Sequence, residues 1–345
     1  MKRRRTPSRI RRSVAAIVAV PVIAMSVACA PGAGPAGSTT LALAHTVDTG
    51  HPIHRCGVES FVSHVEQRTG GEITFDVFPS GQLGNEQELA DNTVWGDLDV
   101  TQPSAGHAAE YFPPLSVLNA AYLFDGYDDL QQVADSPVGE ELWAGLRAET
   151  GLEVLGVWPQ GIRQVTTSAA PVRTPEDLRG VSLRAADSPI WVANALALGA
   201  APTPMALDEL YAALQQGVVQ AQENPVNLID SNSYDEVQRY LSLTDHVVQG
   251  NPLVINGARW ASLTPEQQEI FREAGRISAE RLRACLEQDA ETITAGWRQD
   301  GSMEVIDDVD REAFRDRAEQ EVVPRFDDQW NGLYQRIRSE LEDAS

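Results

Sequence analysis

The sequence of 345 residues has little positive charge. Lys and Arg number 27 against 50 Asp and Glu, so the formal net charge at pH 7 is −23. A chain with this balance repels phosphate backbones and anionic lipid headgroups at long range. We therefore expect no nucleic acid partner.

Motifs that carry common enzyme chemistry are absent as well. The chain has no Gly-x-Ser-x-Gly elbow, Walker loop, His-Glu-x-x-His or Cys-x-x-Cys. A Gly-x-Gly-x-x-Gly match begins at Gly32, but Pro35 lies inside it and no strand and helix are expected on its two sides, so it does not predict a dinucleotide site. His45, His51 and His54 are close in sequence, but metal binding needs further ligands at suitable spacing. We predict no catalytic residue, no cofactor and no metal ion.

Long apolar runs are confined to the N-terminal head. Seven of the 27 basic residues lie at or before Arg12, and residues 13–28 that follow are uncharged and mainly apolar. This stretch is shorter than the roughly 20 residues that span a bilayer, and Pro21 interrupts it. A basic segment followed by a short apolar one is typical of a secretory signal peptide, which we assign to residues 1–28.

The signal peptide ends next to a cysteine. Val27, Ala28 and Cys29 resemble a lipoprotein cleavage box, in which Cys29 becomes the acylated first residue of the mature chain; ordinary secretion is the alternative. Residues 31–40 have the Gly, Pro, Ser and Thr content of a flexible tether. We expect residues 29–40 to be a lipid anchor and tether. They would hold the body in the periplasm or at the outer face of the cytoplasmic membrane, with no other membrane contact.

Cysteine itself is scarce, with three residues in the chain. If Cys29 is acylated, Cys56 and Cys285 remain as one pair, and a disulfide between them would suit an oxidising compartment. Two separate buried thiols are an equal alternative. The sequence alone cannot place the two Cα atoms within the roughly 4.4 to 6.8 Å that a bridge requires.

The rest of the chain predicts an α/β fold. Apolar residues make up 42% of the sequence, and β-rich runs alternate with helical patterns from residue 41 onward. The expected strands are 41–46, 73–78, 98–101, 152–157, 163–167, 181–184, 218–222 and 246–256. The expected helices are 52–69, 86–94, 139–149, 190–198, 207–216 and 226–234. These strands are too many for one small sheet, so we expect two sheets in two lobes.

The C-terminal part of the chain is mainly helical. Thr264-Pro265-Glu266 is a helix start, and the pattern continues to residue 297. A helix of about 30 residues would be about 45 Å long, enough to cross both lobes. Further helix is expected over residues 310–341, with a break or kink at Pro324.

Several separate segments, in order, carry a family resemblance. They include Phe78 to Gly84, Pro114 to Phe124, Gly161 to Ser168, Pro171 to Arg184, Gly199 to Met205, Glu209 to Gln215, Gln222 to Pro225 and Tyr234 to His246. Together they resemble the substrate-binding subunits of tripartite ATP-independent periplasmic (TRAP) transporters, the DctP family. The resemblance covers about residues 41–320.

This resemblance implies a two-lobe fold like that of periplasmic binding proteins, with the long C-terminal helix spanning both lobes. We expect lobe I to comprise residues 41–160 plus 250–289, and lobe II residues 161–249 plus 290–345. The family's function implies closure around a small organic acid and its delivery to membrane-embedded transporter subunits that use an ion gradient.

The resemblance also implies the binding residues. Arg184 matches the family's carboxylate-clamping arginine, whose planar fork can bond both oxygens of a carboxylate. Arg163 matches a second arginine near the ligand, and Asn224 an amide beside the carboxylate. Five further candidates are expected to be polar or to line the cleft: Glu86, Asp187, His45, Thr46 and Trp158.

The ligand is less defined than the clamp. Glu86, Asp187 and the histidines slightly favour a sugar acid such as a uronate, whereas a C4-dicarboxylate would use Arg163 as a second anchor. Residues 185–187 and Leu207 depart from the family pattern, so no particular member's ligand is transferred. Two alternatives remain, a lipid-anchored sensor of the same fold and an exported metal-dependent enzyme that uses the three histidines.

Overall fold

The computed structural model describes residues 38–344 of the chain. The predicted signal peptide, Cys29 and most of the predicted tether lie outside this part. The first strand begins at Thr39, so it takes in the last two residues that we assigned to the tether. Within the described residues, none of the helices combines the length and apolar character needed to cross a bilayer.

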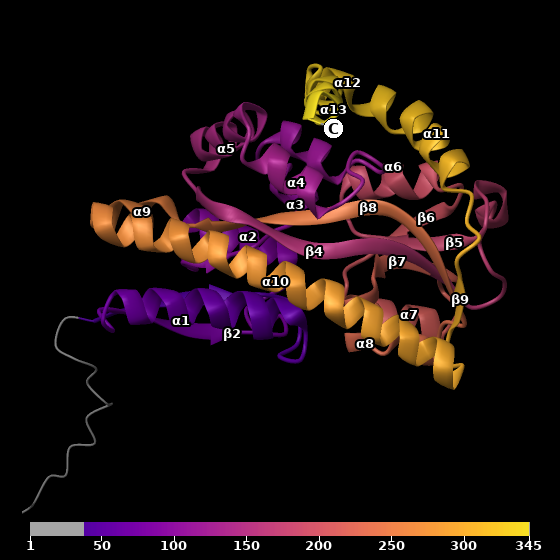
Figure 1. The fold of residues 1–345 in the computed structure, drawn as a ribbon, viewed down its shortest axis with the longest axis horizontal. Helices are drawn as coiled ribbons and strands as arrows, with labels where there is room; N and C mark the ends of the chain where they lie inside the picture. Colours follow the sequence, from indigo (N-terminus) through magenta and orange to yellow (C-terminus); the bar gives the residue numbers. More distant parts are fainter. Residues whose placement is uncertain (1–37, 345) are drawn as a thin grey trace, which may run out of the picture. The chain divides into compact units, whose positions relative to one another are not determined.

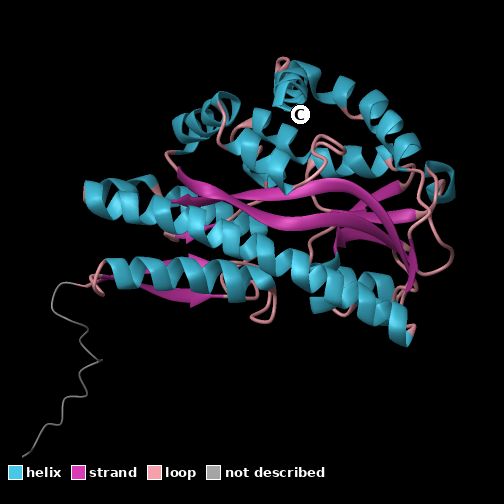
Figure 2. Cartoon of the chain, in the orientation of Figure 1, coloured by secondary structure: helices cyan, strands magenta, loops and turns pink. Residues whose placement is uncertain are grey.

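The described residues form one mixed sheet with helices on both faces (Figures 1 and 2). Its nine strands are β1 (Thr39–Ala44), β2 (Ile73–Phe78), β3 (Val100–Thr101), β4 (Glu153–Thr167), β5 (Ser182–Ala185), β6 (Ala201–Pro204), β7 (Ala221–Pro225), β8 (Tyr240–Ile255) and β9 (Glu304–Ile306). Their order is β2-β1-β3-β8-β4-β7-β5-β6, and β9 pairs with β8. Strands β1, β2 and β3 are parallel to one another, as are β5, β6 and β7.

The expectation of two separate sheets is wrong. We expected a break between residues 157 and 163, but β4 is one strand of 15 residues that pairs with the 16-residue β8 along its whole length. The register shifts between Pro159 and Gly161, so the residue that cannot donate a backbone hydrogen bond lies at an irregularity in the pairing. The long β4–β8 pair therefore joins the two sets of parallel strands into one sheet.

Helices cover this sheet through two main cores. On one face, residues of β1 and β2 and Trp158 of β4 pack with α1 (Glu59–Arg68) and α10 (Pro265–Asp300). The other face carries α4 (Tyr127–Ala134), α5 (Pro137–Thr150), α6 (Pro189–Ala197) and the C-terminal helices. The remaining short helices are α2 (Glu86–Trp95), α3 (Ala105–Ala108), α7 (Leu210–Gln215), α8 (Val226–Ser231), α9 (Gly257–Ser262), η2 (Pro113–Asn119), η3 (Pro175–Leu178) and η4 (Tyr234–Glu236).

The predicted long helix is confirmed as α10, which has 36 residues and is therefore about 54 Å long. A capping box between Thr264 and Gln267 starts it, and Gly301 in the left-handed conformation ends it. The helix contacts α1 and β4 in its first part and α8 and β9 further on (Figure 1). It approaches β4 closely at Gly275, where a Cβ atom would lie 2.2 Å from the carbonyl oxygen of Leu155.

The first predicted helix begins with a π-helical turn, η1 (Ile53–Val58), which leads into α1. This turn carries Cys56, and α10 carries Cys285. The structure joins the two in a disulfide with a Cα–Cα distance of 6.5 Å. The disulfide links segments that are 229 residues apart in sequence.

The tail forms α11 (Arg311–Glu321), α12 (Val323–Trp330) and α13 (Leu333–Ala344). The break expected at Pro324 is present, and Pro324 lies in the first turn of α12, where its missing N–H is not needed. Helices α12 and α13 contact η2, α4 and α5. The tail therefore packs on residues that we expected to belong to the other lobe.

Candidate functional site

A cavity of about 880 Å³ lies at the carboxyl ends of both sets of parallel strands. The segments after β1, β2 and β3 line one side, and those after β5, β6 and β7 line the other. The middle of the β4–β8 pair contributes Gln160, Arg163, Gln249 and Asn251 between them. Open α/β sheets bind ligands at the carboxyl ends of their strands, so the topology alone marks this cavity as the candidate site.

Arg184 is the third residue of β5, and its side chain lines the cavity. The residue is 3% exposed. Its Nε and Nη2 atoms donate to the Met205 carbonyl oxygen at 3.1 and 2.9 Å, and within the described residues Nη1 makes no hydrogen bond. Burial lowers the pKa of Arg184, but an arginine remains charged in proteins. In the described part of the chain, this buried cation forms no ion pair with a carboxylate.

Arg163 of β4 differs from Arg184 because its charge is matched. It is 4% exposed and forms an ion pair with Glu223 of β7. Its Nη1 donates to Gln249 Oε1 at 2.6 Å and its Nη2 to Asn224 Oδ1 at 2.9 Å. The guanidinium also lies over the Trp191 ring, 4.5 Å from its centre. The surrounding strands therefore hold Arg163 in one orientation.

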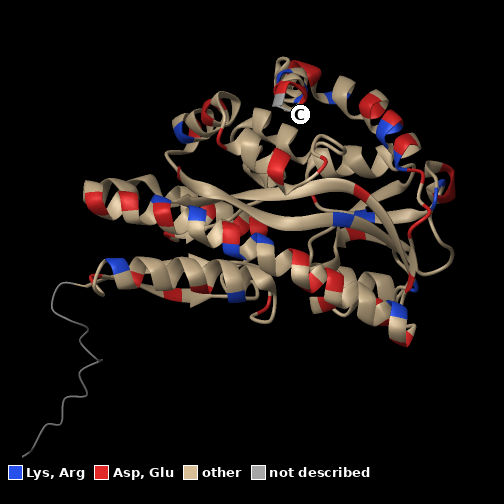
Figure 3. Ribbon diagram, viewed as in Figure 1, with Lys and Arg blue, Asp and Glu red and all other residues tan. Residues whose placement is uncertain are grey.

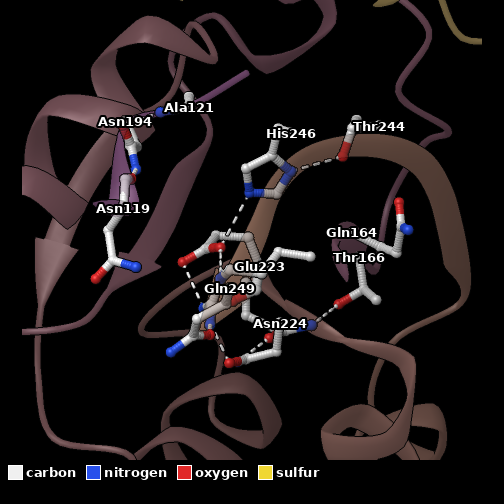
Figure 4. Close-up of polar contacts among 12 residues, drawn as sticks. Asn119, Ala121, Gln164, Thr166, Asn194, Glu223, Asn224, Thr244, His246 and Gln249 are labelled. Carbon is white, nitrogen blue, oxygen red and sulfur yellow. Dashed lines mark hydrogen bonds and ion pairs between the residues drawn. The ribbon is translucent and has the colours of Figure 1, made fainter. Parts of the chain in front are cut away.

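Glu223 is the acid at the centre of this network (Figure 4). Its Oε2 lies 3.0 Å from His246 Nε2, and the other ring nitrogen of His246 lies 2.8 Å from Thr244 Oγ1. Burial alone would raise the pKa of Glu223. Arg163 and His246 lower it by more than burial raises it, so the pKa is about 2. Glu223 is therefore a carboxylate under all ordinary conditions. The sequence signal was an acid in the Gln222 to Pro225 segment of the family resemblance, which we did not interpret.

Asn224 follows Glu223 in β7 and belongs to the same network of polar contacts (Figure 4). It also lines the cavity. Its Oδ1 accepts from Arg163, and its Nδ2 donates to Gln222 Oε1 at 2.6 Å. Amide side chains also line the central part of the cavity, where Gln160 donates to Gln102 at 2.5 Å and Gln249 to Asn251 at 3.2 Å. The cavity wall thus offers many neutral donors and acceptors.

Glu86 begins α2 and lines the cavity opposite β5. Its carboxylate lies 3.2 Å from Nδ1 of His107 and accepts from the backbone N–H of Ser104. Burial alone would raise the pKa of Glu86. His107 and the Ser104 hydrogen bond lower it by more than burial raises it, so the pKa is about 2. Burial lowers the pKa of His107, whereas Glu86 raises it more, so that the net change is upward. His107 was not among the expected site residues.

The remaining expected residues divide into two groups. Thr46 and Asp187 line the cavity. His45 is buried beside His54, with 3.0 Å between Nε2 and the His54 Nδ1, and is not part of the cavity wall. Trp158 does not line the cavity either, because its side chain lies on the α10 side of β4, is fully buried and donates to Ser278 Oγ at 3.0 Å.

The three histidines of the first loop do not form a metal site with their neighbours. Among residues 38–344, no group of three or more His, Cys, Asp or Glu side chains is arranged to hold a metal ion.

A single α/β body with a buried arginine in a cavity at the carboxyl ends of its strands is the architecture of a periplasmic solute-binding protein. Residues 43–329 match the DctP family, described as bacterial extracellular solute-binding protein, family 7. The chain belongs to this family of TRAP solute-binding proteins. Its members are binding proteins rather than enzymes.

Comparison with individual proteins agrees with this assignment. The chain is 34% identical over 268 residues to the 2,3-diketo-L-gulonate-binding periplasmic protein YiaO of Escherichia coli, covering 78% of this chain and 81% of YiaO. A TRAP solute-binding protein from Polaromonas, bound to D-erythronate, has a TM-score of 0.82 at 28% identity, covering 87% of this chain and 98% of that one. A third, from Roseobacter denitrificans with bound L-galactonate, has a TM-score of 0.79 at 28% identity, covering 86% and 98%.

Proposed function

We propose that this protein binds a sugar acid with a single carboxylate and presents it to the membrane subunits of a TRAP transporter. The observation that carries the proposal is Arg184, a buried cation without an ion-pair partner among the described residues. A buried charge is costly unless it is paired, so the site favours a ligand that supplies a carboxylate. The free Nη1 group and the remaining N–H of Nη2 can together bond both carboxylate oxygens.

Among the described residues that line the cavity, a second carboxylate has no comparable partner. Arg163 is the other arginine in its wall, and Glu223 already neutralises it. The other charged side chains in the wall, histidines aside, are acidic: Asp48, Glu86, Glu88, Glu110, Asp187, Asp208 and Glu209. They would repel the far end of a dicarboxylate.

Hydroxyl groups, by contrast, suit this wall well. Glu86 accepts hydrogen bonds, and the amides of Gln102, Gln160 and Asn251 offer both donors and acceptors. The related proteins named above bind 2,3-diketo-L-gulonate, D-erythronate and L-galactonate, which are all oxygen-rich monocarboxylates. This likeness supports the same class of ligand here.

We also propose the arrangement in which the ligand is delivered. Residues 41–160 plus 250–289 and residues 161–249 plus 290–345 would act as two lobes that close on the ligand. The β4–β8 pair, α10 and the contacts of α12 and α13 with η2, α4 and α5 would connect them. An acylated Cys29 and the tether that follows it would keep the protein near the transporter.

The test is a thermal-shift comparison of matched ligands. L-Galactonate and galactarate share the same hydroxylated chain but carry one and two carboxylates, as do D-erythronate and the corresponding tartrate. A ligand at about 100 times its dissociation constant stabilises the fold by about 2.7 kcal/mol. We expect a monocarboxylate to raise the melting temperature and its dicarboxylate partner to have a much smaller effect. Stabilisation by dicarboxylates alone, or by none of a wide panel of sugar acids, would contradict the proposal.

A further inference from the structure

Building on the proposed function, we propose that His51 determines specificity by donating a hydrogen bond from Nε2 to an oxygen of the sugar acid, away from its carboxylate. His51 lies in the loop between β1 and η1, and its side chain lines the cavity. The residue is 1% exposed.

The hydrogen bonds of the loop fix the tautomer of this histidine. The backbone N–H of Ile53 donates to His51 Nδ1 at 3.1 Å, so Nδ1 carries the lone pair and the ring proton is on Nε2. In the described residues, Nε2 is buried and has no hydrogen-bond partner. A buried donor left unpaired costs about 1–3 kcal/mol, so a ligand oxygen at this position would recover a large interaction.

The His51 ring is positioned by its own backbone. The carbonyl oxygen of His51 accepts from the N–H groups of His54 and Arg55 at 2.9 and 3.2 Å, which ties the residue to the start of η1. The donor is therefore presented by an ordered turn rather than by a side chain that must be ordered when the ligand binds. Such preorganisation favours discrimination between similar ligands.

His51 and Arg184 approach the cavity from opposite sides. His51 follows β1, and Arg184 lies near the end of β5; strands β3, β8, β4 and β7 separate them in the sheet. A sugar acid whose carboxylate is bound at Arg184 would extend its hydroxylated carbons toward His51. Arg184 would then bind the carboxylate, and His51 an oxygen near the other end of the ligand.

The chemistry of the donor limits what it can recognise. Burial lowers the pKa of His51 to about 3; nearby Asp48 opposes this change, whereas His45 and Arg55 add to it. The ring is therefore neutral at pH 5–8 and donates one hydrogen bond. Its natural partner is a hydroxyl or carbonyl oxygen, and a site built to bond such an oxygen rejects a deoxy analogue strongly.

The test compares two substitutions at this position. In His51→Asn, the side-chain oxygen can still accept from Ile53, but the donor at the Nε2 position is removed. His51→Gln can place an amide N–H near that position. Isothermal titration of L-galactonate and D-erythronate should show about 10-fold weaker binding for His51→Asn, with affinity partly recovered in His51→Gln. The control is His64→Asn on α1, outside the cavity wall, which should bind like the wild type.

The possible results separate the two proposals. If the wild type binds neither these acids nor any other sugar acid, the proposed function fails and His51 loses its role with it. If the wild type binds and His51→Asn binds equally well, only the role of His51 is overturned. Should His51→Asn fold poorly, ¹⁵N-histidine NMR of the wild type decides. The ligand should protect the Hε2 proton of His51 from exchange with water, and an unprotected proton in the saturated complex would refute the contact.

Discussion

At the residue scale, the two arginines of the cavity have different roles because their partners differ. Arg163 is surrounded by Glu223, Gln249 and Asn224. Within residues 38–344, the hydrogen bonds of Arg184 go to the Met205 carbonyl oxygen alone. The first is a fixed part of the wall. Arg184 is available to a ligand, and its unpaired buried charge lowers the stability of the ligand-free protein.

Replacing Arg184 should therefore separate stability from binding. In Arg184→Met, we expect the free energy of unfolding of the ligand-free protein to be unchanged or higher, because an unpaired buried cation is removed. Sugar-acid affinity should fall by about 10² to 10³-fold. Urea unfolding and calorimetric titration measure the two quantities. A variant that is clearly less stable but binds normally would show that Arg184 is structural.

For Glu223 we expect the opposite effect on stability from that of Arg184: replacing it should lower the free energy of unfolding. Glu223→Gln leaves Arg163 without its carboxylate, so unfolding should become easier by about 3–5 kcal/mol at pH 7. The folded-state pKa of Glu223, about 2, lies below its unfolded value of 4.5. Its stabilising contribution is thus complete above about pH 4.5 and is lost as the pH falls toward 2. The difference between wild type and variant should narrow over that window in urea unfolding; a constant difference would argue against the ion pair.

Much of this site could be predicted from sequence, and the omissions have physical causes. Arg184, Arg163, Asn224 and Glu86 were named from the resemblance, and Thr46 and Asp187 from their places in the sequence; all six line the cavity. Trp158 was expected in the cleft because it stood at the end of a predicted strand, but β4 continues through it and its side chain packs in the core. His51 and His107 depend on ring orientation and hydrogen-bond partners, which only the folded loops define.

At the element scale, the close contact between α10 and β4 depends on glycine. A Cβ atom at Gly275 would lie 2.2 Å from the Leu155 carbonyl oxygen, which is backbone and cannot move independently of the sheet. At Gly296, in the same helix, no atom of the described residues lies within 4 Å of the corresponding position. The two glycines therefore form a matched pair.

We expect Gly275→Ala to lower the free energy of unfolding by about 1–3 kcal/mol, because the helix or strand must shift. Gly296→Ala should raise it by about 0.5–1 kcal/mol, since alanine is the better helix former. Chemical denaturation of both variants tests this. Equal effects at the two positions would mean that α10 does not need the close approach at Gly275.

The elements themselves were largely predictable, since the caps and periodicity of α10 and the alternation of strands and helices are local signals. The number of sheets was not. A single sheet arises because β4 continues through Pro159 and Gly161 and pairs with β8 along its whole length. Neither strand's own sequence predicts its pairing with a strand so far away in the chain.

At the scale of the whole molecule, the net negative charge of the protein should repel the anionic ligand that we propose for it. The formal net charge is −23, and Asp and Glu lie along most of the helices (Figure 3). An anion must cross this field before it reaches the buried arginine. Salt screens long-range repulsion but has little effect on a buried contact.

The association rate of an anionic sugar acid should therefore rise with ionic strength. Between about 10 mM and 150 mM salt the screening length falls from about 30 to 8 Å. Stopped-flow fluorescence can follow binding, because Trp191 lines the cavity. We expect a faster association rate and a nearly constant dissociation rate. An association rate that falls with added salt would show that local positive charge, rather than the net charge, governs the encounter.

The central claim is that the cavity binds a sugar acid through Arg184, and isothermal titration of L-galactonate and D-erythronate tests it most directly. The wild type should bind at least one of these acids, or another sugar acid of the same class, with one site per chain. Arg184→Ala should reduce that affinity by at least about 10²-fold, and Arg325→Ala on the exposed face of α12 should not. Native affinity in Arg184→Ala, or a wild type that binds no sugar acid, would contradict the account.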